Sequence, residues 1–281
     1  LHLQSGNVER ARALLEELTE AAPSLLEAWE KLVVVYVQQS DEDALQKLID
    51  RLETHEIGRG HIFAFAWGHL TLMRDNPAGA RSYFQQAQSL NPRSLPVLEP
   101  VLKLNLQEGN IESAAPLTKQ VLKAQPDNAY GNYAQASIFA LEGKLKEAER
   151  SLRQSLDKRK TPEALNDLAW LLLEGGQHAE SEKAVRQALQ IDGSLPHVWD
   201  TLGTILTRTR RLDEAEKALE HSLSLQPGNV SVLLHLAELH AAKGNRMRAL
   251  ELVGLLSEKR EQLAPKEQGK LADIRRRIEV A

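Results

Sequence analysis

Apolar residues recur along this chain at spacings of three and four. Val198 and Leu202 mark one apolar face, and Leu219 and Leu223 mark a second face after a polar turn. Spacings of three and four place side chains on one side of an α-helix. The pattern therefore predicts pairs of short amphipathic helices joined by turns.

This helix pair repeats with a constant period. The small residues Ala169, Gly203 and Ala237 are 34 residues apart, and Gly68 holds the same phase earlier in the chain. Paired helices approach closely only where the facing side chains are short. A sustained period of about 34 residues is the signature of a helix–turn–helix solenoid.

A second recurrent feature marks the turn inside each helix pair. A Gly-Asn dipeptide occupies this point three times, as Gly6-Asn7, Gly109-Asn110 and Gly244-Asn245. Glycine stands at the same phase in Gly143 and Gly176. Glycine readily ends a helix in the left-handed conformation. We therefore expect the first helix of each pair to end at these glycines.

The repeating positions resemble those of the tetratricopeptide repeat family. That pattern has a bulky residue, Leu-Gly or Leu-Ala, an aromatic, an Ala, another aromatic, an Ala and a terminal Pro. In one repeat these slots hold Trp199, Leu202-Gly203, Leu206, Ala215, Leu219, Ser222 and Pro227. The resemblance covers nearly the whole chain, and the stretches Asn166–Trp170 and Asp200–Gly203 also look loosely like repeats common in bacterial proteins. It implies an all-α, right-handed superhelical solenoid of antiparallel helix pairs, and it favours a bacterial origin.

The repeat phase also predicts where each unit begins. Residues 1–25 are expected to be the second half of a truncated repeat. Seven tetratricopeptide-like repeats are expected at 26–60, 61–94, 95–128, 129–161, 162–195, 196–229 and 230–260. Residues 261–281 are expected to form a capping helix that starts at Pro265, since a solenoid needs its last apolar face covered. Leu271, Ile274 and Ile278 are expected to face the last repeat.

The first residue falls inside the first helix of a repeat, because Leu1–Gly6 aligns in phase with Leu104–Gly109. A half-repeat leaves an apolar face uncovered. We therefore expect the chain to be a fragment of a longer protein, and we expect that self-association could occur through the open half-repeat.

The repeat at 95–128 departs from the others because it contains three prolines. Pro96 fits the first turn of a helix, whereas Pro100 and Pro116 should fall inside helices. An interior proline removes a hydrogen bond and bends its helix. A bend is expected near residues 96–118, either as a hinge between two halves or as a static distortion.

Composition excludes several classes of function. The formal net charge is −4, so the chain has no global basic field for nucleic acid. The chain has no cysteine, which excludes disulfides and cysteine-based zinc sites. No apolar run approaches the ~18 residues of a membrane span. The cytoplasm and a bacterial periplasm or envelope both remain open as locations.

The sequence contains no convincing catalytic or metal-binding constellation. His235 and His240 are five residues apart, so they do not share a helix face as a zinc-binding i, i+4 pair does. No nucleophile motif of the Gly-x-Ser-x-Gly type occurs. We therefore expect no enzymatic activity, no cofactor and no metal.

The family resemblance implies that the first helix of each repeat lines a concave groove. Carried over position by position, the candidate groove residues are Tyr130, Tyr133, Asn166, Asp167, Trp170, His197, Asp200, Thr204, His235 and Glu238. Earlier repeats offer Glu30, Lys31, Phe65, His69, Glu99 and Lys103. Aromatic rings supply contact area, and amides pair with an extended backbone.

These residues predict a non-catalytic scaffold that binds a protein or peptide in its groove. Asp167, Asp200 and Glu238 would favour a ligand with basic residues. Alternatively, these residues do not bind a ligand: Tyr130 and Tyr133 fill gaps between helices, and the acidic side chains are only solvated. The alternative for the function is a regulatory or assembly arm of a larger enzyme, or of an envelope polysaccharide or protein export system.

Overall fold

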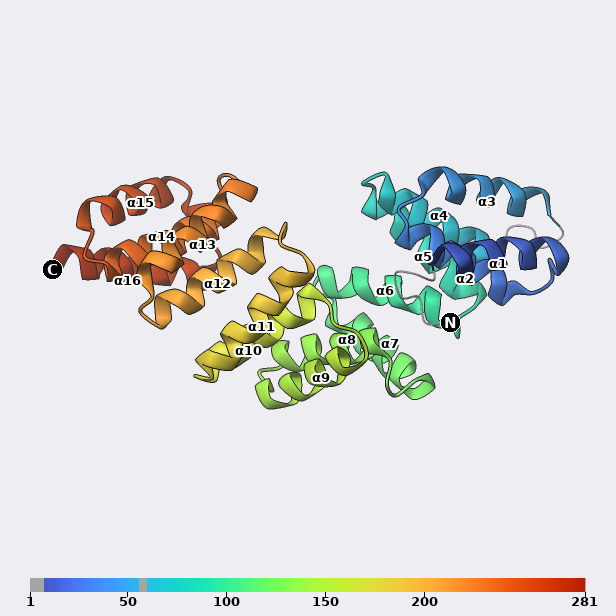
Figure 1. Ribbon diagram of the computed structural model, residues 1–281, viewed down its shortest axis with the longest axis horizontal. Coiled ribbons are helices and arrows are strands. Elements are labelled where there is room, and N and C mark those ends of the chain that lie inside the picture. Colours follow the sequence, from blue (N-terminus) through green and yellow to red (C-terminus); the bar gives the residue numbers. More distant parts are fainter. Residues whose placement is uncertain (1–7, 56–59, 281) are drawn as a thin grey trace. The chain divides into compact units, whose positions relative to one another are not determined.

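The computed structural model describes residues 8–55 and 60–280, with side chains up to residue 278, and every regular element in this part is helical (Figure 1). The elements are α1 (Val8–Ala21), α2 (Leu26–Gln38), α3 (Glu42–Thr54), α4 (His61–Met73), α5 (Pro77–Leu90), α6 (Leu95–Gln107), α7 (Ile111–Ala124), α8 (Ala129–Leu141), α9 (Leu145–Lys158), α10 (Pro162–Glu174), α11 (His178–Ile191), α12 (Pro196–Arg208), α13 (Leu212–Leu225), α14 (Val230–Ala242), α15 (Arg246–Glu258), the short 3-10 helix η1 (Arg260–Gln262) and α16 (Pro265–Val280).

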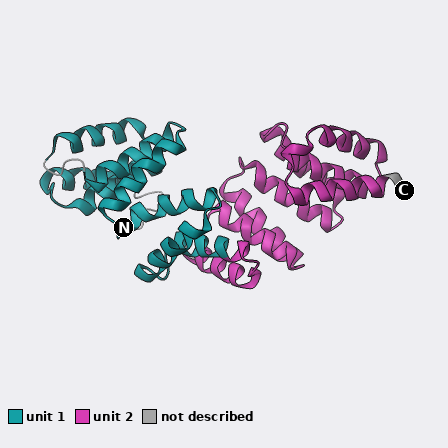
Figure 2. Cartoon of the chain, turned by 180° about the vertical axis from the view of Figure 1, so that it is seen from behind, with its two compact units in different colours: residues 1–138 teal, residues 139–281 magenta. Residues whose placement is uncertain are grey.

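The chain divides into two compact units, unit 1 (Leu1–Ile138) and unit 2 (Phe139–Ala281), shown in Figure 2. Within each unit, helices that follow one another along the chain pack as antiparallel pairs, as α4 with α5 in unit 1 and α12 with α13 in unit 2. The expected all-α tetratricopeptide-like architecture is confirmed. The division between the units falls within α8, and not in the proline-containing region 96–118.

The Gly-Asn dipeptide combines the end of one helix with the start of the next. Gly109 and Gly244 have φ values of 68° and 73°, which is the left-handed conformation expected of them. The side chains of Asn110 and Asn245 each accept a hydrogen bond from the backbone N–H three residues later, at 3.1 and 3.3 Å. One dipeptide therefore ends the first helix and caps the second. The copy at Gly6-Asn7 lies outside the described residues.

Three of these turns have the same geometry without glycine. Ser40, Asp75 and Arg210 have φ values of 52°, 54° and 63°. A residue with a Cβ atom in this conformation costs roughly 1–2 kcal/mol relative to a right-handed one. The turn geometry is therefore imposed by the packing of the helix pair, even where the residue disfavours it.

The small residues lie where the two helices of a pair cross. A Cβ atom built on Gly68 would lie 2.5 Å from Cε1 of Phe84, and one built on Gly203 would lie 2.5 Å from Cγ of Leu219. Both distances are shorter than van der Waals contact. The predicted reason for the small residues, close approach of paired helices, is confirmed.

Helix α16 covers the end of unit 2. It begins at Pro265 as expected and packs against α14 and α15. Leu271, Ile274 and Ile278 are buried, so the apolar side of α16 completes the core of the last pair. The predicted capping helix is confirmed.

The prolines of α6 and α7 lie inside continuous helices. Pro96 is in the first turn of α6, Pro100 is in its interior, and Pro116 is inside α7. Each interior proline removes one backbone hydrogen bond. The bend expected near 96–118 stays a prediction.

Candidate functional site

In unit 2 the first helices of successive pairs lie next to one another. Helix α10 contacts α12, α12 contacts α14, and α14 contacts the capping helix α16. Three of these helices, α10, α12 and α14, carry most of the residues predicted for the groove: Asn166, Asp167, Trp170, His197, Asp200, Thr204, His235 and Glu238. The structure therefore brings these eight residues onto adjacent helices of one unit.

Two of the predicted residues contact each other. Nδ1 of His235 lies 2.6 Å from Oδ1 of Asp200, and each side chain is 13% exposed. The contact joins α12 to α14 across the repeat boundary. The carboxylate of Asp200 is therefore engaged within the protein.

The predicted acid on α14 is also engaged. Nζ of Lys270 lies 2.6 Å from Oε2 of Glu238, and Oγ of Ser231 donates to Oε1 of Glu267 at 2.6 Å. Both contacts join α14 to α16. Polar pairs therefore hold the capping helix in addition to its apolar face.

The remaining residues on α10 and α12 differ in accessibility. Asn166 and Thr204 are buried, and Oδ1 of Asn166 and Oγ1 of Thr204 have no hydrogen-bond partner among the described residues. Trp170 is partly exposed and His197 is exposed. Solvent, and hence a ligand, reaches Trp170 and His197 more directly than Asn166 or Thr204.

Tyr130 and Tyr133 belong to unit 1, on α8. Their ring centroids are 5.9 Å apart and the rings are tilted by 39°. Tyr130 also packs against the buried cluster that contains Leu102 and Ala134. Burial, and then the nearby carboxylate of Glu99, raises the pKa of Tyr130. Its phenol therefore stays neutral at physiological pH.

Two of the earlier candidates of unit 1, Phe65 and Glu30, are engaged within the protein. Phe65 lies in the core beside Phe84, with 6.3 Å between ring centroids, so the expectation that it lines the groove is wrong. A ring at this position fills the space beside Phe84 and is not available to a ligand. Oε1 of Glu30 accepts from Oγ of Ser94 at 2.7 Å and lies 2.9 Å from Nε2 of His61.

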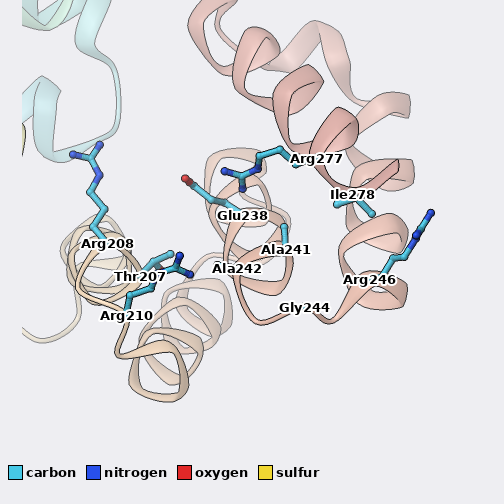
Figure 3. A pocket seen from close by; sticks show the side chains of 10 residues that line it. All are labelled: Thr207, Arg208, Arg210, Glu238, Ala241, Ala242, Gly244, Arg246, Arg277 and Ile278. Atoms are coloured by element: carbon cyan, nitrogen blue, oxygen red, sulfur yellow. The ribbon is translucent and has the colours of Figure 1, made fainter. Parts of the chain in front are cut away.

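A pocket that the sequence reasoning did not identify lies in unit 2 (Figure 3). It has a volume of about 690 Å³ and is lined by Thr207, Arg208, Arg210, Glu238, Ala241, Ala242, Gly244, Arg246, Arg277 and Ile278. In the sequence, Arg208 and Arg210 belong to one local basic cluster and Arg277 belongs to another, and each cluster is either solvated surface or a contact for an acidic partner. Arg210 and Arg277 line one pocket because α16 packs against α14.

No metal site or membrane span emerges from the described residues. No group of three or more His, Cys, Asp or Glu side chains in the described ranges is arranged to hold a metal ion. His235 contacts Asp200 on α12, whereas Nε2 of His240 lies 3.6 Å from Glu216 on α13. None of the helices as described combines the length and apolarity needed to cross a bilayer.

Sequence profiles described as tetratricopeptide repeat match residues 1–56, 103–160, 142–196 and 206–266. The chain belongs to the tetratricopeptide repeat family. These matches cover both units and agree with the helix pairs and close crossings described above.

One curated protein of known role is similar to this chain in sequence. The chain is 28% identical over 138 residues to the type IV pilus assembly protein PilF of Pseudomonas aeruginosa. The match covers 48% of this chain and 54% of PilF, so the chain spans about half the length of this relative. A bacterial origin is consistent with this similarity.

Two solved structures share the fold. The Cut9–Hcn1 hetero-tetramer of APC/C matches with a TM-score of 0.76 and 16% identity, over 95% of this chain and 53% of that one. The P. aeruginosa PilF structure matches with a TM-score of 0.59 and 17% identity, over 76% and 96% of the two chains. At these identities the similarity shows the fold alone.

Proposed function

We propose that this chain is a non-catalytic scaffold that binds a protein or peptide segment along α10, α12 and α14 of unit 2. The observation that carries the proposal is Trp170, a partly exposed indole on α10, with His197 exposed on the neighbouring α12. Partly exposed aromatic side chains are the commonest anchors of protein interfaces. Binding of protein partners is also the common role of this repeat family.

The acidic residues Asp200 and Glu238 bear on which ligands the proposed groove would prefer. Asp200 already contacts His235, and Glu238 already contacts Lys270. A basic ligand residue would have to replace Lys270 at Glu238. We therefore expect the indole to supply most of the affinity, and the acids to add a preference for basic residues that weakens at high salt.

The name of one relative supports a role in assembly. PilF is a type IV pilus assembly protein, and Cut9–Hcn1 is a hetero-tetramer. We infer by analogy that this chain serves an assembly of several proteins. A regulatory arm of a larger enzyme or of an export system is the alternative, and flanking sequence would distinguish the two.

The experiment uses two tryptophans of unit 2. A randomised peptide library is selected on the purified chain, and the affinity of a selected peptide is then measured for Trp170→Ala and Trp199→Ala. Trp199 is the matched control because it packs on His221 of α13, with 4.6 Å between ring centroids, and it is outside the predicted groove set. Loss of an anchoring indole should weaken binding by at least about tenfold, or about 1.4 kcal/mol. Equal affinity of Trp170→Ala and the unmodified chain would refute the proposed groove.

Unit 1 supports a second candidate, self-association through α1. Leu14 and Leu18 of this helix are 47% and 41% exposed. Two leucines four residues apart form a small apolar stripe, which a second copy of the chain could cover. Sedimentation of the chain and of the double variant Leu14→Glu/Leu18→Glu tests this: the variant should be monomeric at concentrations where the original chain self-associates. The same sedimentation behaviour for both would exclude α1 as the contact.

A further inference from the structure

We propose that the arginine-lined pocket of unit 2 binds an acidic peptide segment in which carboxylates alternate with aliphatic side chains. This goes beyond the proposed function, because the pocket is built by the end of α12, the following turn, α14, the start of α15 and α16. It shares only Glu238 with the predicted groove residues. Its ligand chemistry is also the opposite of the basic preference proposed for the groove.

The first observation is the direction of two arginines. Arg210 lies in the turn after α12, and Arg277 lies on α16. In Figure 3 their side chains extend toward α14 from opposite sides. Arg208 and Arg246 lie farther out, at the rim of the same pocket. Two guanidinium groups on opposite sides can each bind a carboxylate with a pair of parallel hydrogen bonds.

The second observation is that these two arginines are not neutralised by the protein. Arg210 and Arg277 have no side-chain hydrogen bond or ion pair among the described residues. Nearby basic groups do have acidic partners: the pairs are Arg208 with Glu174, Arg211 with Glu182 and Glu214, Lys243 with Asp213 and Glu216, and Arg248 with Glu251. The positive charge of the pocket is therefore available to a ligand.

The one carboxylate that lines the pocket does not cancel this charge. Glu238 is paired with Lys270 at 2.6 Å, and Lys270 is outside the lining residues. The lining therefore keeps an excess of positive charge contributed by Arg210, Arg246 and Arg277. Carboxylate groups are the peptide chemistry that complements this charge.

The shape and the apolar lining indicate a peptide and not a nucleic acid. Ala241 and Ala242 are short side chains of α14, and Ile278 of α16, which also lines the pocket, is almost fully buried. The two alanines, which are partly exposed, can receive an aliphatic side chain of the ligand. The pocket lining contains no aromatic ring on which a base could stack, and the net charge of the chain is −4.

Arg210 makes the proposal testable without damage to the fold. It occupies the left-handed turn position, with φ of 63°, which is glycine in four other turns. Glycine adopts this conformation without steric cost. Arg210→Gly therefore removes the guanidinium group and relieves the turn at the same time.

A structural role for the arginines is the competing explanation. Arg277 lies in the last turn of α16, where a basic side chain interacts favourably with the helix dipole. That role predicts a change in thermal stability without a change in ligand binding. The two explanations therefore differ in what an Arg277 variant changes.

The test is fluorescence anisotropy of a labelled peptide of alternating Glu and Leu, titrated with the full chain at low salt. We expect saturable binding that salt weakens, and no binding of the same peptide with Gln in place of Glu. Arg210→Gly and Arg277→Gln should each weaken binding by about tenfold or more. Two variants serve as matched controls and should bind as the original chain does. Asp75→Gly makes the same turn substitution in unit 1, and Arg276→Gln removes an arginine of α16 that pairs with Asp273.

Several outcomes would overturn the proposal. These are no binding of the Glu-Leu peptide, equal binding of the Gln-Leu peptide, and unchanged affinity in Arg210→Gly. Equal affinity for inorganic phosphate, or competition by duplex DNA at the same concentration, would assign the pocket to phosphate instead. Trp170→Ala should leave Glu-Leu binding unchanged, so a failure of the proposed groove remains distinguishable from a failure of this pocket.

Discussion

Units 1 and 2 are built from the same repeat but pack it with different side chains. Nine of the twelve aromatic residues of the chain lie in unit 1, and three lie in unit 2. The fully buried Trp29, Phe65 and Phe84 belong to one large cluster in unit 1. In unit 2, buried hydroxyls supply part of the packing: Oγ of Ser181 donates to the carbonyl of Ala169 at 2.7 Å.

The clearest contrast is between two tryptophans in equivalent local settings. The indole N–H of Trp29 donates to the carbonyl of Pro23 at 2.9 Å, and that of Trp199 donates to Gly193 at 2.8 Å. Each acceptor is six residues earlier. Yet Trp29 is completely buried, whereas Trp199 is partly exposed. The same local hydrogen bond thus serves a core residue in one unit and a surface residue in the other.

This difference suggests a division of roles. Unit 1 buries four of its nine aromatic side chains in its core, whereas all three aromatic side chains of unit 2 are partly exposed. Unit 2 leaves Trp170 partly exposed and leaves Arg210 and Arg277 without acidic partners among the described residues. We therefore expect recognition to depend on unit 2 more than on unit 1, and four predictions test the packing difference on which this rests.

The largest effect is expected for the two tryptophans. Trp29→Ala should lower the free energy of unfolding of unit 1 by about 3–5 kcal/mol, because it empties a fully buried site. Trp199→Ala should cost unit 2 about 1–2 kcal/mol, because its ring is already partly solvated. Hydrogen exchange with mass spectrometry, read separately for peptides of α2 and α12 in increasing denaturant, measures both. Equal losses would show that the two sites are energetically alike.

The next effect concerns the crossing glycines. Gly68→Ala should destabilise unit 1 by about 2–3 kcal/mol and Gly203→Ala should destabilise unit 2 by about 1–2 kcal/mol. The rigid ring of Phe84 is held by other rings, whereas Leu219 can change rotamer. Thermal unfolding monitored by circular dichroism gives the comparison.

Gly254→Ala is the matched control for these variants. Gly254 is inside α15, and a Cβ atom there meets nothing within 4 Å. Alanine should stabilise this helix by roughly 0.5–1 kcal/mol. A destabilising Gly254→Ala would mean that the glycine effects do not arise from close approach of the helices.

The pH dependence should differ between the units. Burial, followed by the charge of Lys103, lowers the pKa of His69 in unit 1 from 6.5 to about 4. Between these values the unfolded chain binds a proton that the folded chain does not bind. Stability should therefore fall as the pH falls from 6.5 to about 4, by on the order of 2 kcal/mol. Urea unfolding across this range, compared with His69→Leu, isolates the contribution.

Unit 2 provides the comparison for this pH effect. Burial also lowers the pKa of His240, but the carboxylate of Glu216 opposes the shift. We expect the same sign and a smaller slope in unit 2. A steeper loss of hydrogen-exchange protection in α14 than in α4 on acidification would contradict this order.

The smallest effect is expected at the left-handed turns. Ser40→Gly in unit 1 and Arg210→Gly in unit 2 should each stabilise their turn by about 0.5 kcal/mol, since the relief of backbone strain exceeds the added entropy of the unfolded chain. Melting temperatures of the two variants measure the gain. A lower melting temperature for either would show that its side chain contributes to the turn.

Much of the fold was predictable from the chain because it depends on local or neighbouring residues. The left-handed Gly109 and Gly244, the close crossings at Gly68 and Gly203, and the buried face of α16 follow from residue type and period. The repeat boundaries, the proline bend and the roles of the groove residues stay predictions.

The candidate site was less predictable because it depends on which side chain reaches which partner. The position of Phe65 in its repeat predicted that it lines the groove. In the structure its ring is buried in the core. Position also indicated that Asp200 and Glu238 face a ligand, and the structure pairs them with His235 and Lys270.

The sequence by itself therefore determined the type of protein, its helix pairs, their turns and the capping helix. These features follow from interactions within one repeat or between adjacent repeats. Such interactions require the same residue types at the same position of each repeat, so they are visible as a pattern in the sequence. Only the tertiary structure decided which charges are neutralised and that Arg210 and Arg277 line one pocket. The pocket depends on the packing of α16 against α14, and the ion pairs depend on which individual side chains meet between neighbouring helices. The repeat pattern of the sequence predicts neither.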